Sequence, residues 1–341
     1  MIRRLLYALA FIVTPASAAN DAAILAEKPP KLLSAYGLFA DGATQAPANN
    51  VVPYDLATPL YSDYAKKLRF VYVPQGTSAI YNADDVFNFP IGTALIKSFG
   101  YDKQDGIGFN LIETRLLLRK ESGWVALPYV WNEDKSDAKL KVAGKRLPVT
   151  FIDPSGTEHT IRYQVPNKNQ CKSCHSLNGK IVPIGPKTLH LEKEFTYATG
   201  KQNQLDYWVA HGILTGLSSP RAPSIDAHTP SSGSLADRAR TYLDVNCGHC
   251  HRTGGMGDNS GLFLNWAEKV PARYGIKKHP VAAGRGSGGL IYDIAPGKPD
   301  DSILIYRMAS DDPGIAMPEI GRSLPHKEGI ALIREWIESL K

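Results

Sequence analysis

Cysteine and methionine are both scarce in this sequence, with four of each among 341 residues. Beyond residue 18, no apolar run approaches the roughly 20 residues that cross a bilayer as a helix, so we expect a chain that does not span a membrane. The net charge is also small, because 39 Lys and Arg residues nearly balance 33 Asp and Glu residues. The basic residues are scattered and form no cluster. Nucleic-acid-binding proteins need a clustered basic face, so this balance excludes nucleic acid as a partner.

Residues 1–18 have the pattern of an export signal. Arg3 and Arg4 give a basic start, and residues 5–13 form an apolar run of nine. Ala16 and Ala18 then place small residues at −3 and −1 relative to a cut after Ala18. An uncleaved membrane anchor is the alternative, but the apolar run is short for one. We therefore expect a Sec-type signal peptide and a mature protein in the periplasm.

All four cysteines fall into two C-x-x-C-H motifs. The first contains Cys171, Cys174 and His175, and the second contains Cys247, Cys250 and His251. Two thiols at this spacing can each bond one vinyl group of a haem, and the adjacent imidazole then reaches the iron. The sequence therefore predicts two covalently attached haem c groups, with His175 and His251 as the proximal iron ligands.

Two other interpretations of C-x-x-C pairs agree less well with this sequence. A zinc ribbon has about 15–20 residues between its pairs, whereas Cys174 and Cys247 are 73 positions apart. A thioredoxin-like dithiol requires a βαβ context, which neither pair has, and it leaves both histidines unexplained.

The chain before the first motif has a strand-forming pattern. Runs of β-branched and aromatic residues occupy 68–73, 91–99, 111–119 and 124–131, and a hairpin is expected over 149–165 around a Pro/Gly turn. Several short strands with regular turns predict a sandwich or a small barrel. We weigh two roles for it, a docking module for a redox partner and a packing shell for the first haem.

The chain after the first motif is mainly helical. Helices are expected at 202–211, from Ser234 as an N-cap up to Cys247, and from about Lys327 to the end. The predicted fold class is α+β: a β-rich N-terminal domain, a short haem segment and a mainly α domain. The predicted boundaries are 1–18 for the signal peptide, 19–165 for the β-rich domain, 166–217 for the first haem segment, 218–233 for a linker and 234–341 for the second haem domain.

Residues 234–341 resemble a class I cytochrome c domain. The resemblance rests on Pro296-Gly297-Lys298-Pro299, Ser302-Ile303-Leu304, Arg307-Met308, Met317-Pro318 and Ile333-Arg334-Glu335-Trp336-Ile337. The whole mature chain is similar to a bacterial family of dihaem c-type cytochromes with a β-rich N-terminal half and no assigned function. That similarity rests on Pro59-Leu60-Tyr61-Ser62-Asp63, Phe89-Pro90-Ile91-Gly92-Thr93 and Asn203-Gln204-Leu205.

The resemblance implies a distal ligand for the second haem in a Met-Pro turn, and Met317 fits this position. Met256 and Met308 are the competitors; Met256 is close to His251 in a Gly-rich loop, and Met308 lies in a helix-like or strand-like stretch. For the first haem, His190 is the candidate distal ligand, and an open or water-bound iron is the alternative.

These expectations favour an electron carrier over an enzyme. We expect a periplasmic dihaem cytochrome that passes electrons between redox proteins, and no catalytic residue is assigned. The alternative is a peroxidase-like haem oxidoreductase with an open axial position at the first haem.

Overall fold

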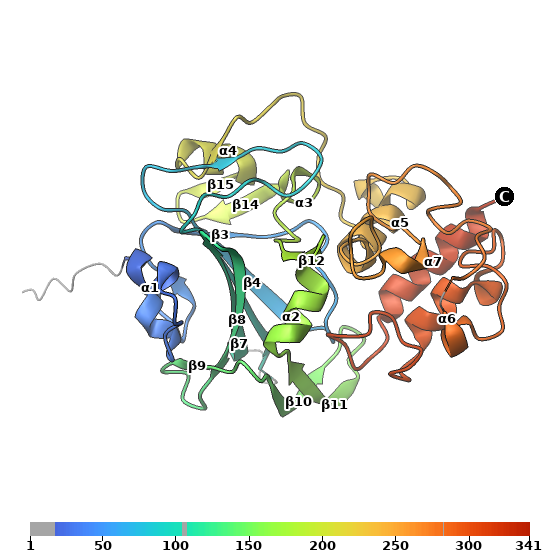
Figure 1. The fold of residues 1–341 in the computed structure, drawn as a ribbon, viewed down its shortest axis with the longest axis horizontal. Helices are drawn as coiled ribbons and strands as arrows, with labels where there is room; N and C mark the ends of the chain where they lie inside the picture. The colour runs from blue at the N-terminus through green and yellow to red at the C-terminus, as the bar shows by residue number, and fades with distance from the viewer. Residues whose placement is uncertain (1–17, 104–107, 282) are drawn as a thin grey trace, which may run out of the picture.

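The computed structural model describes residues 18–103, 108–281 and 283–341, so all of the expected signal peptide except Ala18 lies outside the described residues. A six-stranded antiparallel sheet dominates the N-terminal half (Figure 1). Its strands, in spatial order, are β3 (Val51–Tyr54), β4 (Lys66–Tyr72), β6 (Ala94–Asp102), β7 (Phe109–Lys120), β8 (Gly123–Trp131) and β9 (Ala138–Leu140). Four of the predicted strand runs correspond to β4, β6, β7 and β8 and are confirmed.

One face of this sheet is closed by the N-terminal segment. Alternate side chains such as Phe70, Ile96 and Leu116 point to this face and are buried there. They pack on residues of α1 (Asp21–Leu25) and of the 3₁₀ turn Leu33–Tyr36. The short hairpin of β1 (Phe39–Asp41) and β2 (Ala46–Pro47) completes the cover.

The opposite face packs on the segment that follows the sheet. The helices there are α2 (Lys168–His175), α3 (Thr188–Leu191) and α4 (Gln204–Ala210). Small two-stranded sheets connect them: β12 (Ser176–Leu177) with β13 (Lys180–Ile181), β14 (Glu194–Tyr197) with β15 (Gly200–Asn203), and β16 (Leu214–Thr215) with β5 (Ala79–Ile80). Trp208 of α4 is fully buried in the same core as Val71 and Leu117 of the sheet. Residues 166–217 and the sheet therefore share one core.

The predicted hairpin is formed by β10 (Lys145–Ile152) and β11 (Glu158–Val165). It packs across one end of the large sheet, where Phe151 stacks on Tyr101 with ring centroids 4.3 Å apart. The protein thus belongs to the mixed α+β class, as expected. It has one open six-stranded sheet and several small ones rather than the expected sandwich or barrel, because sequence alternation predicts strands but not their partners.

The C-terminal half is helical (Figure 1). Its helices are α5 (Leu235–Leu243), which continues into a π-helical turn over Asp244–Gly248, α6 (Ile303–Ala309) and α7 (Lys327–Ser339). Ser234 caps α5 as predicted, because its side chain accepts a hydrogen bond from the Asp237 amide. The 3₁₀ turns of this half and the preceding segment are Pro230–Ser232, Asp258–Ser260, Gly284–Ser287 and Pro299–Asp301. Ile333 and Trp336 of α7 are buried against α5 and α6.

The two halves contact each other through specific polar and aromatic groups. The Asp63 carboxylate accepts hydrogen bonds from the backbone amides of Ser323 and Leu324, at 2.7 to 2.9 Å. The ring of Tyr61 stacks on His326 with centroids 4.1 Å apart. Within the described residues, no helix is long and apolar enough to cross a membrane.

Candidate functional site

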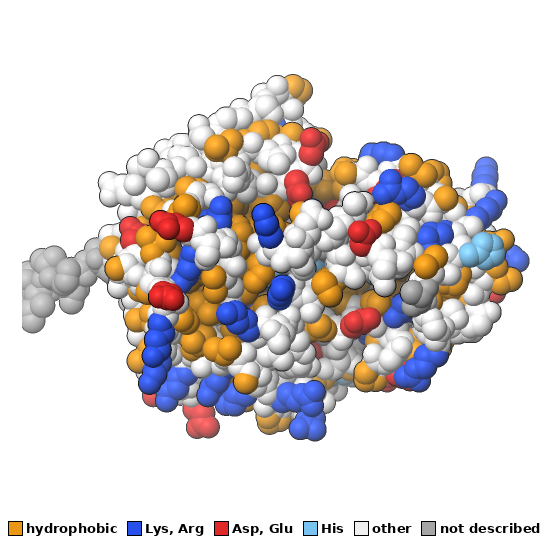
Figure 2. Space-filling model, viewed as in Figure 1, with side chains coloured by type: hydrophobic (Ala, Val, Ile, Leu, Met, Phe, Trp, Pro, Cys, Tyr) orange, Lys and Arg blue, Asp and Glu red, His pale blue; other side chains and the backbone are white. Residues whose placement is uncertain are grey.

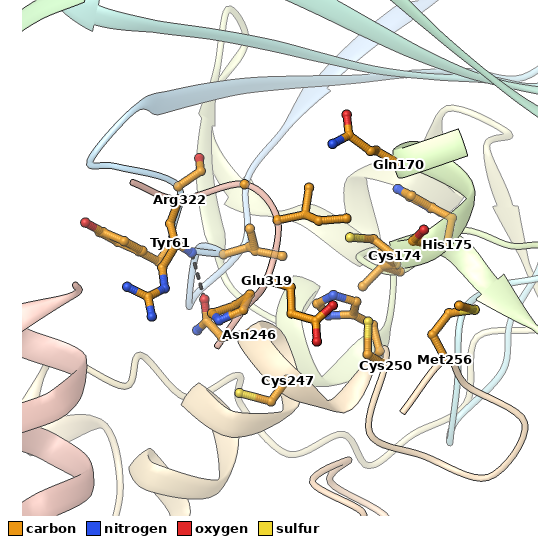
Figure 3. Close-up of a pocket in the computed structure, with 18 of the residues that line it drawn as sticks. Tyr61, Gln170, Cys174, His175, Asn246, Cys247, Cys250, Met256, Glu319 and Arg322 are labelled. Carbon is orange, nitrogen blue, oxygen red and sulfur yellow. Dashed lines mark hydrogen bonds between the residues drawn. The ribbon is translucent and has the colours of Figure 1, made fainter. Parts of the chain in front are cut away.

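A cavity of about 730 Å³ lies where the two halves meet. Its walls come from the large sheet, from α2 and from the loops of the C-terminal half, and both C-x-x-C-H motifs line it. Figure 3 shows Cys174 and His175 of the first motif, with Cys250 and Met256 below them. Two motifs 73 positions apart in sequence therefore share one cavity.

The first motif lies on α2. A capping box starts this helix, because Asn167 accepts from the Gln170 amide and the Gln170 side chain accepts from the Asn167 amide. His175 ends the helix, and its Nδ1 lies 2.8 Å from the carbonyl oxygen of Val182. Nδ1 is thereby the donor, which leaves Nε2 as the nitrogen with a free lone pair.

The second motif follows the π-helical turn that contains Cys247. The Nδ1 of His251 lies 3.3 Å from the carbonyl oxygen of Leu262, which repeats the arrangement at His175. Burial lowers the pKa of both His175 and His251 to about 4, so both rings are neutral at pH 7. Iron-binding histidines are neutral and donate their second N–H to a partner in this way.

The thiols are free, and two of them lie close together across the motifs. The sulfur atoms of Cys174 and Cys250 and one ring nitrogen of His249 lie within 4.8 Å of one another. Hydrogen bonding from Cys250 and His249 lowers the pKa of Cys174, and burial raises that of Cys247 to about 12. Three such ligands also suit zinc, although a structural zinc site normally has four.

Met317, the candidate ligand from the sequence, lines the cavity. Its loop is fixed on both sides, because the Met317 amide donates to the Arg307 carbonyl at 3.0 Å and the Arg322 guanidinium donates to the Met317 carbonyl at 3.1 Å. Met308 also borders the cavity, but it is a buried core residue of α6. Met256 lines it as well and is 58% exposed.

His190 occupies a different position from the one expected of a distal ligand. It is not among the residues that line the cavity, and its Nε2 lies 3.0 Å from Oδ2 of Asp244. Both side chains are almost fully buried, at 3% and 2% exposure. His190 thus connects residues 166–217 to the turn before Cys247, a contact between residues 54 positions apart that sequence spacing does not reveal.

Several cavity residues were not identified from sequence. His249 lies inside the second motif and is buried beside Cys174, and its position between two cysteines was the available signal. Arg69, Lys97 and Arg115 form a cationic group on the sheet wall. Their signal was a cation in the interior of each of three strands, at a position that strand alternation places on the same face as buried apolar residues.

The chain's own residues fit a pair of haem groups. The free thiols of both motifs border a cavity, the two motif histidines have Nδ1 held by backbone carbonyls, and a methionine thioether lines the same space. Comparison of the chain with protein-family models, curated proteins and solved structures finds no match.

Proposed function

We propose that this protein is a periplasmic dihaem c-type cytochrome of the kind that the sequence resembles, and that it transfers electrons between redox proteins. One observation carries the proposal: two C-x-x-C-H motifs line a single cavity, and each places a neutral histidine whose Nδ1 is held by a backbone carbonyl. In this proposal residues 234–341 form the class I cytochrome c-like domain. Each haem, when attached, supplies an iron that accepts and releases one electron.

The residues have distinct roles in this proposal. Cys171 and Cys174 bond the first haem, and Cys247 and Cys250 bond the second. His175 and His251 are the proximal ligands, and the Val182 and Leu262 carbonyls orient them.

Met317 would supply a thioether to the second haem, and such a ligand raises the potential. Because both motifs line one cavity, groups held by them would lie close enough for electrons to pass within one chain.

A peroxidase-like enzyme is the second candidate, and the position of His190 favours it. Because His190 binds Asp244 away from the cavity, it does not provide the sixth ligand from its observed position. Carbon monoxide added to the reduced protein separates the two candidates. A carrier with both irons six-coordinate does not bind it, whereas an open first haem binds one equivalent.

The proposal is tested by expressing the full-length gene in a host that attaches haem c. We expect the reduced pyridine spectrum to give two haems per chain, and the mass to exceed that of the polypeptide by about 1.2 kDa. The double variant Cys171→Ser/Cys174→Ser should retain one haem. Lys172→Ala, a change at an exposed residue inside the same motif, should retain two.

A colourless product at polypeptide mass would refute the haem assignment. One zinc ion per chain in that product would instead assign Cys174, His249 and Cys250 to zinc.

A further inference from the structure

Three cationic side chains, Arg69, Lys97 and Arg115, form a row across the face of the sheet that borders the cavity. Arg69 on β4 is the register partner of Lys97 on β6, and Lys97 is the register partner of Arg115 on β7. Side chains of directly paired residues lie on the same face, and all three line the cavity. Figure 2 shows Lys and Arg side chains interspersed with hydrophobic ones on the visible face of the N-terminal half. Like charges paired in this way destabilise a sheet unless an anion compensates them.

The described carboxylates compensate only part of this charge. Glu113 forms a two-point contact with Arg115, at 2.5 and 2.9 Å, and it also accepts from the Tyr163 hydroxyl. Asp55 lies 2.8 Å from Nη1 of Arg69, and it is shared with Lys193. No described residue forms an ion pair with Lys97, which lies between the two guanidinium groups. The three cations of the row face two carboxylates, one of which is shared with Lys193, so at least one positive charge has no partner.

Arg69 also has hydrogen-bond donors without an acceptor among the described residues. Its side chain is 3% exposed, and its Nε and Nη2 have no hydrogen-bond partner among the described residues. Nε and Nη2 form the edge of a guanidinium that binds a carboxylate at two points. Burying such donors without an acceptor is unfavourable, so the arrangement calls for an anion. Burial and the neighbouring arginines also lower the pKa of Lys97 to about 7, a sign of the same uncompensated charge.

The first motif lies near this row. Cys171 and Cys174 line the same cavity as Arg69, Lys97 and Arg115. A ligand fixed to these cysteines therefore occupies the space that the row faces. Haem carries two propionate groups on the edge opposite its attachment points, and carboxylates are the acceptors that Lys and Arg bind best.

We propose that Lys97 and Arg69, with Arg115 beside them, form a carboxylate-binding site on the sheet wall that receives a propionate of the first haem. This inference rests on the proposed function, because it takes the haem to be attached at Cys171 and Cys174. It assigns the β-rich half a direct role in setting the electronic properties of that haem. A positive charge at this site stabilises the ferrous state, which is the less positive one, and so raises the potential.

The first test compares Lys97→Met with Lys97→Arg in the dihaem protein. Lys97→Met should retain two haems, lower the potential of one haem and leave the other unchanged, and it should shift the propionate bending bands in resonance Raman spectra. Lys97→Arg should restore the wild-type potential. Lys66→Met is the matched control, because Lys66 is on the adjacent strand with a side chain that is 62% exposed; it should change neither readout.

The second test needs no variant and distinguishes a propionate from a free carboxylate. Succinate is titrated into wild-type dihaem protein by calorimetry. We expect no binding, because the propionate already occupies the site. Binding of one succinate per chain that Lys97→Met abolishes would overturn the propionate assignment in favour of a separate carboxylate ligand.

The outcomes separate this inference from the proposed function. Two haems per chain, with potentials and propionate bands unchanged in Lys97→Met, would overturn the inference and leave the cytochrome assignment intact. A wild-type chain without haem would overturn both.

Discussion

Nε2 of His190 lies 3.0 Å from Oδ2 of Asp244, and this buried pair joins residues 166–217 to the turn that precedes Cys247. Asp244 also accepts from the Trp266 amide at 2.9 Å through its other oxygen. The carboxylate thus holds three segments together. His190 has a structural role at this position, and the first prediction tests that role.

His190→Gln should destabilise the protein by about 1–3 kcal/mol, because it disrupts a buried hydrogen bond to a charged group. The visible spectrum and both haem potentials should stay unchanged. Urea unfolding measures the first effect, and a redox titration measures the second. His211→Gln, at an exposed residue that ends α4, should alter neither. Carbon monoxide binding that appears only in His190→Gln would instead show that His190 reaches the iron.

Met317→Leu should lower the potential of one haem by well over roughly 100 mV, because axial ligands control a wide span of potential. Leucine keeps the volume but offers no sulfur. Met308→Leu is the matched control, since Met308 is a core residue of α6, and it should leave both potentials in place. Spectroelectrochemistry gives both values, and an unchanged titration in Met317→Leu would remove Met317 as a ligand.

Acid should weaken the contact between the halves through His326. Burial lowers the pKa of His326 to about 3, and its Nδ1 lies 2.9 Å from the Tyr242 hydroxyl. An unfolded imidazole titrates near about 6.5, so the unfolded chain binds the proton first as the pH falls. The contribution of His326 to stability is therefore complete above about pH 6.5 and declines toward pH 3.

The test is the free energy of unfolding measured between pH 7 and pH 4. His326→Gln should flatten its dependence on pH by at most about 1.4 kcal/mol per pH unit, the limit for one proton. His279→Gln, at an exposed histidine, should keep the wild-type slope. Equal slopes in wild type and His326→Gln would contradict the assignment.

Asp63→Ala should cost about 2–4 kcal/mol, because the amides of Ser323 and Leu324 would lose their acceptor. Since these amides follow the Met317 loop, the C-terminal half should also become more sensitive to protease between Met317 and Leu324. Thermal unfolding and limited proteolysis give the two readouts. Asp84→Ala at an exposed loop position is the control, and matching behaviour of both variants would refute the prediction.

Local structure was largely predictable from sequence, whereas long-range contacts were not. The Ser234 cap and the α7 helix were predicted correctly because capping and a 3.6-residue period are local signals. The two C-x-x-C-H motifs were evident because their residue types and spacing can be recognised in the sequence alone. The pairing of His190 with Asp244 depends on how two segments pack, and no local pattern records that. The cation row across β4, β6 and β7 likewise depends on strand register.

The shared cavity also bears on how this chain can change over evolutionary time. Each half carries one C-x-x-C-H motif, but the wall around either motif includes residues of the other half. Exchange of one half by recombination would leave the remaining motif facing water and without its neighbouring wall. The two halves are therefore expected to be inherited as a single unit, and not as modules that combine freely with other partners.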